Sequence, residues 1–162
     1  NRQYLDNLSH KMQFFIHFPL PNCSHSLCPI YTRHIYVHGY KIIGITNQGG
    51  VKAGFKSLDD CILEQRITKT ILGISDIFFC PHDPECMHLD EDGDVNIIYN
   101  HVTRYRKPHT GMLETAMYLF EGDIDKSFYC GDRGEDREAA YAFEIKFFEA
   151  KEILVPQVWD TL

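Results

Sequence analysis

The sequence lacks a long apolar stretch, because none of its apolar runs approaches the ~20 residues that a transmembrane helix needs. Its first residues also lack the basic start, apolar segment and small-residue cleavage site of a secretory signal peptide. An excess of basic residues is missing as well, since the formal net charge is -7. An acidic balance argues against non-specific nucleic-acid binding. These absences predict a cytoplasmic protein without a membrane span, for which nucleic acid is a disfavoured partner.

What remains is the composition of an ordinary globular domain. The 162 residues are 44% hydrophobic and 24% charged, which suits one domain over residues 1–162 with a real core. No internal repeat or low-complexity tract interrupts it. Without a signal peptide, the six cysteines point to metal ligation or buried thiols rather than to a disulfide framework.

Short apolar runs alternate with helical patterns along the chain. Ser57 followed by Asp60 resembles a capping box at the start of one such helix. Pro29 and Gly39 bracket another, with proline near the start and glycine past the end. This alternation predicts an α/β fold with a parallel sheet and right-handed crossovers. The predicted strands are 41–45, 76–79, 127–130 and 146–150, and the predicted helices are 29–39, 57–72, 110–120 and 135–143.

Polar residues follow three of the predicted strands, where open parallel sheets bind their ligands. The first run ends in Thr46-Asn47-Gln48, the second in Cys80-Pro81-His82 and the third in Gly131-Asp132-Arg133. Lys107 precedes the helix at 110–120. A lysine neutralises phosphate charge, and an aspartate holds a hard cation such as Mg²⁺ through oxygen. Each feature alone is weak evidence, but together they predict a phosphate-plus-metal site.

Four motifs in order, ITNQGGV, FCPHDPEC, RKPHTGMLETA and FYCGDRGEDREAA, resemble the haloacid dehalogenase superfamily of phosphatases. More narrowly, they are similar to the histidinol-phosphatase and heptose-bisphosphate-phosphatase branch, over about residues 28–150. The resemblance implies a Rossmann-like three-layer fold, with a central, mainly parallel sheet and helices on both faces. It also implies Mg²⁺-dependent hydrolysis of a small phosphorylated metabolite through an aspartyl-phosphate.

The resemblance also assigns roles to individual residues. Thr46 would bind the transferring phosphoryl group, and Asn47 would position phosphate or substrate. Lys107 would be the third-motif lysine, with Arg106 as a substrate contact beside it. Two carboxylates of the fourth motif complete the set: Asp132 would ligate Mg²⁺, and Asp136 would support the metal or its waters.

The same branch often carries a zinc loop, and CPHDPECMH offers Cys80, His82, Cys86 and His88 as ligands. A Cys₂His₂ set suits a structural zinc ion. The alternative is a pair of loop histidines and two buried thiols. These residues would lie in an inserted loop at about 80–107. Within it, DEDGD at 90–94 lacks the glutamate of a calcium-binding loop, which favours a solvated acidic turn.

The family's first motif, an apolar strand followed by Asp-x-Asp, is missing from the expected place. Its first aspartate attacks phosphorus and its second acts as general acid and base. Family spacing places the motif near the first residues, where Asn1 and Gln3, or Asp6 and Leu8, would occupy the two positions. The segment at 12–18 is apolar enough for a strand, but no Asp-x-Asp follows it. The start of the chain is truncated or altered, or the phosphatase is degenerate, or the spacing differs.

Three hypotheses follow from these observations. The first is a Mg²⁺-dependent phosphomonoesterase, and the second is a catalytically silent domain that still binds phosphate, a phosphorylated ligand or a partner. The third is a module held together by zinc. A polynucleotide 3′-phosphatase shares some of the motifs, but the acidic charge and the lack of a basic–aromatic stripe disfavour it.

Overall fold

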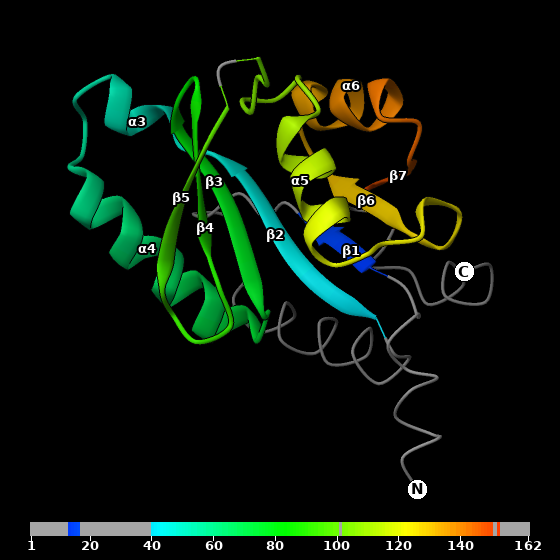
Figure 1. The fold of residues 1–162 in the computed structure, drawn as a ribbon, viewed down its shortest axis with the longest axis horizontal. Helices are drawn as coiled ribbons and strands as arrows, with labels where there is room; N and C mark the ends of the chain where they lie inside the picture. Colours follow the sequence, from blue (N-terminus) through cyan, green and yellow to red (C-terminus); the bar gives the residue numbers. More distant parts are fainter. Residues whose placement is uncertain (1–12, 17–39, 101, 151, 153–162) are drawn as a thin grey trace, which may run out of the picture.

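The computed structural model describes residues 13–16, 40–100, 102–150 and 152. Its elements form three layers, with a sheet in the middle and helices on either side (Figure 1). The strands are β1 (Gln13–Ile16), β2 (Lys41–Asn47), β3 (Asp76–His82), β4 (Glu85–Leu89), β5 (Val95–Tyr99), β6 (Phe128–Gly131) and β7 (Lys146–Glu149). The helices are α3 (Gly49–Lys52), α4 (Leu58–Leu72), α5 (Gly111–Leu119), α6 (Gly134–Ala142) and the short 3₁₀ helix η1 (Ile124–Lys126).

The strands of the described residues form one seven-stranded sheet in the order β5-β4-β3-β2-β1-β6-β7. Five strands that are neighbours in the sheet, β3, β2, β1, β6 and β7, pair in parallel, as the alternation of strands and helices predicts. β1 lies between β2 and β6, so β2 to β5 extend the sheet on one side of β1, whereas β6 and β7 extend it on the other side. Such a change of direction is where doubly wound sheets bind ligands.

The segment predicted as a loop contains an antiparallel hairpin instead. β4 pairs with β3 and β5 pairs with β4, both antiparallel, so the sheet is mixed. The acidic turn at 90–94 joins the two strands, and Gly93 takes a positive φ of 91° there. The hairpin was missed because its strands are short and polar residues separate them, which obscures the alternation that marks a strand.

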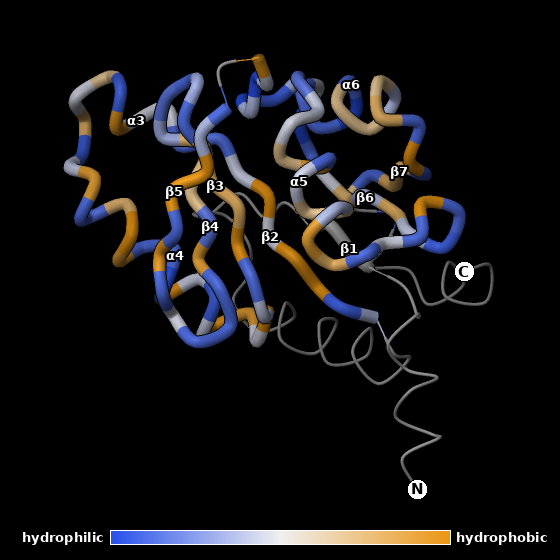
Figure 2. Tube along the Cα trace, in the orientation of Figure 1, coloured by the Kyte–Doolittle hydropathy of each residue, from blue (hydrophilic) through white to orange (hydrophobic). Residues whose placement is uncertain are grey.

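Two apolar cores flank the sheet because successive side chains of a strand point to opposite faces. Ile42, Ile77 and Phe79 pack with Cys61 and Leu72 of α4 on one face. The other face packs against α5 and α6 through a second cluster, which includes Ile43, Ile45, Phe78, Met112, Ala116 and Ala139. Figure 2 shows apolar residues running along β2 between the helical layers. This accounts for near-continuous apolar runs in the strands, which are covered on both faces.

The sequence signals for the remaining elements are also found in the structure. Ser57 caps α4, because its Oγ accepts the backbone N–H of Asp60 at 3.0 Å. Gly73 ends the same helix in the left-handed conformation, with φ 64°. The helix predicted at 29–39 lies outside the described residues. None of the helices in the described part has the length and apolar character needed to cross a membrane.

Candidate phosphate-binding site

The site is built at the carboxyl ends of β2 and β6 and in the segment before α5. Thr46 and Asn47 end β2, where Thr46 pairs with Phe79 of β3. Beyond them, the backbone N–H of Gln48 donates to the Cys80 carbonyl at 2.8 Å. The backbone of the polar residues at the end of β2 is therefore fixed to the neighbouring strand β3.

Asn47 clamps the segment that carries Lys107. Its Oδ1 accepts the backbone N–H of Lys107 at 2.9 Å, and its Nδ2 donates to the Lys107 carbonyl at 3.0 Å. The same Nδ2 donates to Glu135 Oε1 at 3.1 Å. Since an amide has two N–H donors, both are used by the protein. Asn47 thus acts on the site by fixing the backbone of Lys107.

Lys107 lies at the centre of a buried polar cluster. Its Nζ donates to the Ile45 carbonyl at 3.0 Å, to Tyr129 Oη at 3.1 Å and to Asp136 Oδ1 at 2.5 Å. The side chains of Lys107 and Asp136 are both 0% exposed. Burial lowers the pKa of Lys107, although the charge and the hydrogen bond of Asp136 act in the opposite direction. A buried charge needs this degree of pairing to be tolerated.

Tyr129 completes the cluster and was not predicted from the sequence. Its hydroxyl donates to Asp136 Oδ1 at 2.8 Å while it accepts from Lys107. Burial and the charge of Asp136 raise the pKa of Tyr129 well above its usual value. In the sequence, Tyr129 is one of several aromatic residues in an apolar strand. The available signal was that a buried phenol requires a polar partner.

The two carboxylates that resemble a magnesium motif have different surroundings. Asp132 is exposed after the end of β6. Asp136 is fully buried, with Oδ2 accepting the Arg133 N–H at 3.1 Å while Oδ1 is held by Lys107 and Tyr129. Gly131 permits this approach, because a Cβ there would lie 2.5 Å from the Asp136 Cβ. Asp132 is therefore exposed to solvent, whereas Asp136 acts as the counter-ion of Lys107.

Arg106 extends toward the turn after β2. Its guanidinium lies 2.7 Å from where a Cβ of Gly49 would be, so any larger residue would collide with it. Its backbone N–H donates to Asp83 Oδ1 at 3.0 Å, which ties it to the turn between β3 and β4. Asp83 is a second residue that the sequence did not single out. Arg106 thus brings a positive charge beside the turn at Gln48-Gly49, close to Thr46 in the chain.

The four side chains predicted to hold zinc do not converge. His88 stacks on Phe78 with ring centroids 4.3 Å apart, and its Nε2 lies 2.8 Å from Asp76 Oδ1. His82 lies 3.4 Å from Glu85 and is 41% exposed. In the described residues, no group of three or more His, Cys, Asp or Glu side chains is arranged to hold a metal ion.

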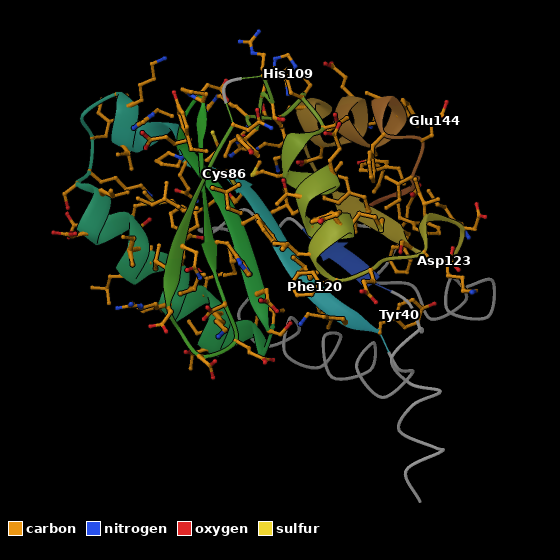
Figure 3. The ribbon with its side chains drawn as sticks, viewed as in Figure 1. Tyr40, Cys86, His109, Phe120, Asp123 and Glu144 are labelled. Carbon is orange, nitrogen blue, oxygen red and sulfur yellow. The ribbon has the colours of Figure 1, made fainter. Side chains whose placement is uncertain are left out.

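The two predicted cysteine ligands belong to the core instead. Cys80 and Cys86 are 0% exposed and belong to the same core cluster as Tyr105, on the α5 face of the sheet. Figure 3 labels Cys86. Burial raises the pKa of the Cys80 thiol to about 12 and also raises that of Cys86. Among the residues that the structure describes, neither thiol is part of a group of three or more side chains that could hold a metal ion. The arrangement supports the alternative of buried thiols, and His88 is a partner of Asp76.

The resemblance implies an attacking carboxylate after the first strand, and the first strand of the described residues is β1. β1 occupies the centre of the sheet, between β2 and β6. Its end is followed in sequence by His17, Phe18 and Pro19, which lie outside the described residues. No Asp or Glu occurs in the sequence from His17 to Leu58. The positions near Asn1 that family spacing indicates also lie outside the described residues, so the placement of this motif stays a prediction.

Comparison with known proteins decides the family. The family model described as polynucleotide kinase 3 phosphatase matches residues 18–152. The D-glycero-β-D-manno-heptose-1,7-bisphosphate 7-phosphatase of Rhodopseudomonas palustris is 33% identical over 136 residues, which cover 78% of this chain and 71% of that protein. The chain belongs to this family of haloacid dehalogenase-type phosphatases.

Other haloacid dehalogenase-type proteins agree with this assignment. The heptose-bisphosphate 7-phosphatase of Salmonella typhi is 29% identical over 119 residues, which cover 70% of this chain but only 58% of that protein. A solved structure of D,D-heptose 1,7-bisphosphate phosphatase from B. bronchiseptica, complexed with magnesium and phosphate, superposes with a TM-score of 0.61. It covers 89% of this chain and 86% of that chain at 14% identity, which shows that the fold is shared.

Proposed function

We propose that this chain is a haloacid dehalogenase-type phosphomonoesterase domain that binds a small phosphorylated sugar, with its attacking carboxylate missing or altered. The observation that carries the proposal is the buried cluster of Lys107, Tyr129 and Asp136 beside the end of β2, since a lysine fixed at this edge suits a phosphoryl group. The relatives named above act on a phosphorylated sugar, and this supports the same substrate class here.

The charges of the described residues decide how a phosphate would be held. Asp136 offsets part of the charge of Lys107, which reduces the attraction of this pair for a dianion. Arg106 supplies a further positive charge, and the Thr46 hydroxyl supplies a donor. Mg²⁺ would be held by Asp132, with phosphate and water oxygens completing its shell, and would neutralise charge on the phosphoryl group.

A specific observation also favours the silent alternative. Attack on phosphorus by this family's route requires a carboxylate after the central strand, and none follows β1 before Asp59. Binding and turnover are therefore separate properties of this chain. Thr46, Arg106 and Lys107 are the groups that would hold phosphate, whereas no carboxylate that could attack it occurs between β1 and Asp59.

Calorimetry and a phosphate-release assay on the whole chain separate these properties. We expect inorganic phosphate to bind in the presence of Mg²⁺, and Thr46→Val to weaken that binding by about tenfold, the value of one hydrogen bond to a charged group. Lys41→Met, at the other end of the sheet, is the control and should leave the affinity unchanged. If wild-type protein with Mg²⁺ binds no phosphate, the proposal fails.

The substrate panel distinguishes the remaining possibilities. It contains mono- and bisphosphorylated sugars and a 3′-phosphorylated oligonucleotide, the latter because of the family model that matches. Release from a sugar phosphate supports the enzyme, and binding without release supports the silent domain. Release from the oligonucleotide alone would contradict the assignment to sugars.

A further inference from the structure

A chain of polar side chains runs from helix α4 to Thr46. Gln48 Nε2 donates to Thr46 Oγ1 at 3.1 Å, and Lys56 Nζ donates to Gln48 Oε1 at 2.8 Å. Glu64, on α4, forms an ion pair with the same Nζ. Figure 1 shows α3 and the start of α4 on the same side of the sheet. The chain thus connects the surface of α4 with a hydroxyl at the candidate phosphate site.

Lys56 fixes the orientation of the Gln48 amide. An ammonium can only donate hydrogen bonds, so the atom of Gln48 that faces Lys56 must be the carbonyl oxygen. The NH₂ group of Gln48 must then face Thr46. Lys56 lies closely along this turn, because a Cβ at Gly50 would stand 3.4 Å from its Cε. The direction of both hydrogen bonds, from Lys56 to Gln48 and from Gln48 to Thr46, therefore follows from Lys56, whose ammonium group can only donate.

This direction leaves the hydrogen of the Thr46 hydroxyl available. Its oxygen accepts from Gln48, so the hydroxyl can donate only to another group. The acceptor in the structure is the Asn47 carbonyl at 3.4 Å, which is long for a bond of this type. A phosphoryl oxygen would be a better acceptor. Donation from an amide held by a cation also strengthens the donor character of the hydroxyl.

We propose that Gln48 and Lys56 are positioning residues that present the Thr46 hydroxyl to the phosphoryl group. This inference rests on the proposed function, because it takes Thr46 to contact phosphate. Lys56 acts through Gln48 and not by touching the phosphate itself, and Glu64 holds Lys56 in place from α4. These hydrogen-bonded side chains link the surface of α4 to the Thr46 hydroxyl and set its orientation.

The sharpest test reverses the bond to Thr46. In Gln48→Glu, a side chain of nearly the same shape can only accept, so the Thr46 hydroxyl would donate to it and be lost to phosphate. We expect inorganic phosphate, titrated with Mg²⁺, to bind the variant about tenfold more weakly than wild type. Gln48→Met, which removes the donor without reversing the bond, should lose about threefold.

A second test separates positioning from charge. Lys56→Met should weaken phosphate binding by about threefold to fivefold, while Lys56→Arg retains a donor and should restore most of it. The matched control is Lys52→Met on α3, which removes the same charge from an exposed side chain. If Lys52→Met weakens binding as much as Lys56→Met, charge explains the effect and the proposal fails.

The deciding measurement is a double-mutant cycle with Thr46→Val. If Lys56 acts through Gln48 on the hydroxyl, Lys56→Met should have no further effect once that hydroxyl is removed. A long-range charge effect would persist in the Thr46→Val background and weaken with added salt. Equal losses in both backgrounds overturn the inference while the proposed function stands. Absence of phosphate binding by wild-type protein overturns both.

Discussion

Two Lys–Asp pairs lie at opposite ends of the sheet, one fully buried and one partly exposed. At the amino ends of the strands, Lys41 Nζ lies 2.9 Å from Asp76 Oδ2, and His88 holds the other oxygen at 2.8 Å. At the carboxyl ends, Lys107 Nζ lies 2.5 Å from Asp136. The side chain of Lys41 is 32% exposed, whereas that of Lys107 is not exposed.

The surroundings explain why only one pair belongs to a site. Lys41 approaches Asp76 Oδ2 away from the hydrogen-bonding direction and also lies 4.0 Å from the centre of the Phe120 ring. Its neighbours are aromatic, and Figure 3 shows Phe120 and Tyr40 at the end of the molecule opposite His109. Lys107 has a carbonyl, a phenol and a carboxylate around it, beside the polar end of β2. A buried ion pair alone therefore does not mark a ligand site.

The largest expected effect is at the carboxyl-end pair. Asp136→Asn leaves the Lys107 ammonium buried without its counter-ion and should lower the free energy of unfolding by about 3–5 kcal/mol. Urea denaturation measures the change. Replacing both residues, as Lys107→Met with Asp136→Leu, should cost less than the single change, because no charge is left unpaired. If Asp136→Asn were as stable as wild type, Lys107 would not depend on Asp136 as its buried counter-ion.

The second effect is a pH dependence at the amino-end pair. Burial raises the pKa of Asp76, but hydrogen bonds from His88 and Ser75, together with the charge of Lys41, outweigh it and lower the pKa from 3.8 to about 2. The unfolded chain then binds a proton at higher pH than the folded one. Stability from this group is present above the unfolded value and is lost as the pH falls from about 5 to about 2, by roughly 2 kcal/mol.

Urea denaturation at pH 5.5 and at pH 2.5 measures this loss in wild type and in Asp76→Asn. The variant should lose roughly 2 kcal/mol less than wild type between the two conditions, because it has no carboxylate to titrate at this position. An identical pH dependence in both proteins would show that Asp76 is not held in its ionised form by its partners.

The smallest effect is expected for Lys41→Met. Because this lysine is partly exposed, water can replace some of its contact with Asp76, and the loss should be about 1 kcal/mol. Phosphate affinity should not change, in contrast to Lys107→Met, which acts at the other end of the sheet. Thermal denaturation with and without phosphate compares the two variants. If Lys41→Met and Lys107→Met changed phosphate affinity equally, the carboxyl ends of the strands would not differ from the amino ends in phosphate binding.

Local signals found most of the fold. The runs at 41–45, 76–79, 127–130 and 146–150 became β2, β3, β6 and β7, because strands covered on both faces are apolar throughout. The β4–β5 hairpin and the central place of β1 were missed. Neither has a distinctive local pattern, and each is defined by pairing with strands distant in the chain.

The sequence by itself determined the alternation of strands and helices and the capping of α4 by Ser57. It also predicts that Thr46, Lys107 and Asp132 act together at one edge of the sheet, and this stays a prediction. Only the tertiary structure decided that Asp136 pairs with Lys107 and Tyr129, and that His88 binds Asp76 instead of zinc. The physical reason is that propensity and capping act between neighbours in the chain. The partner of a buried charge is chosen by which strands and helices meet.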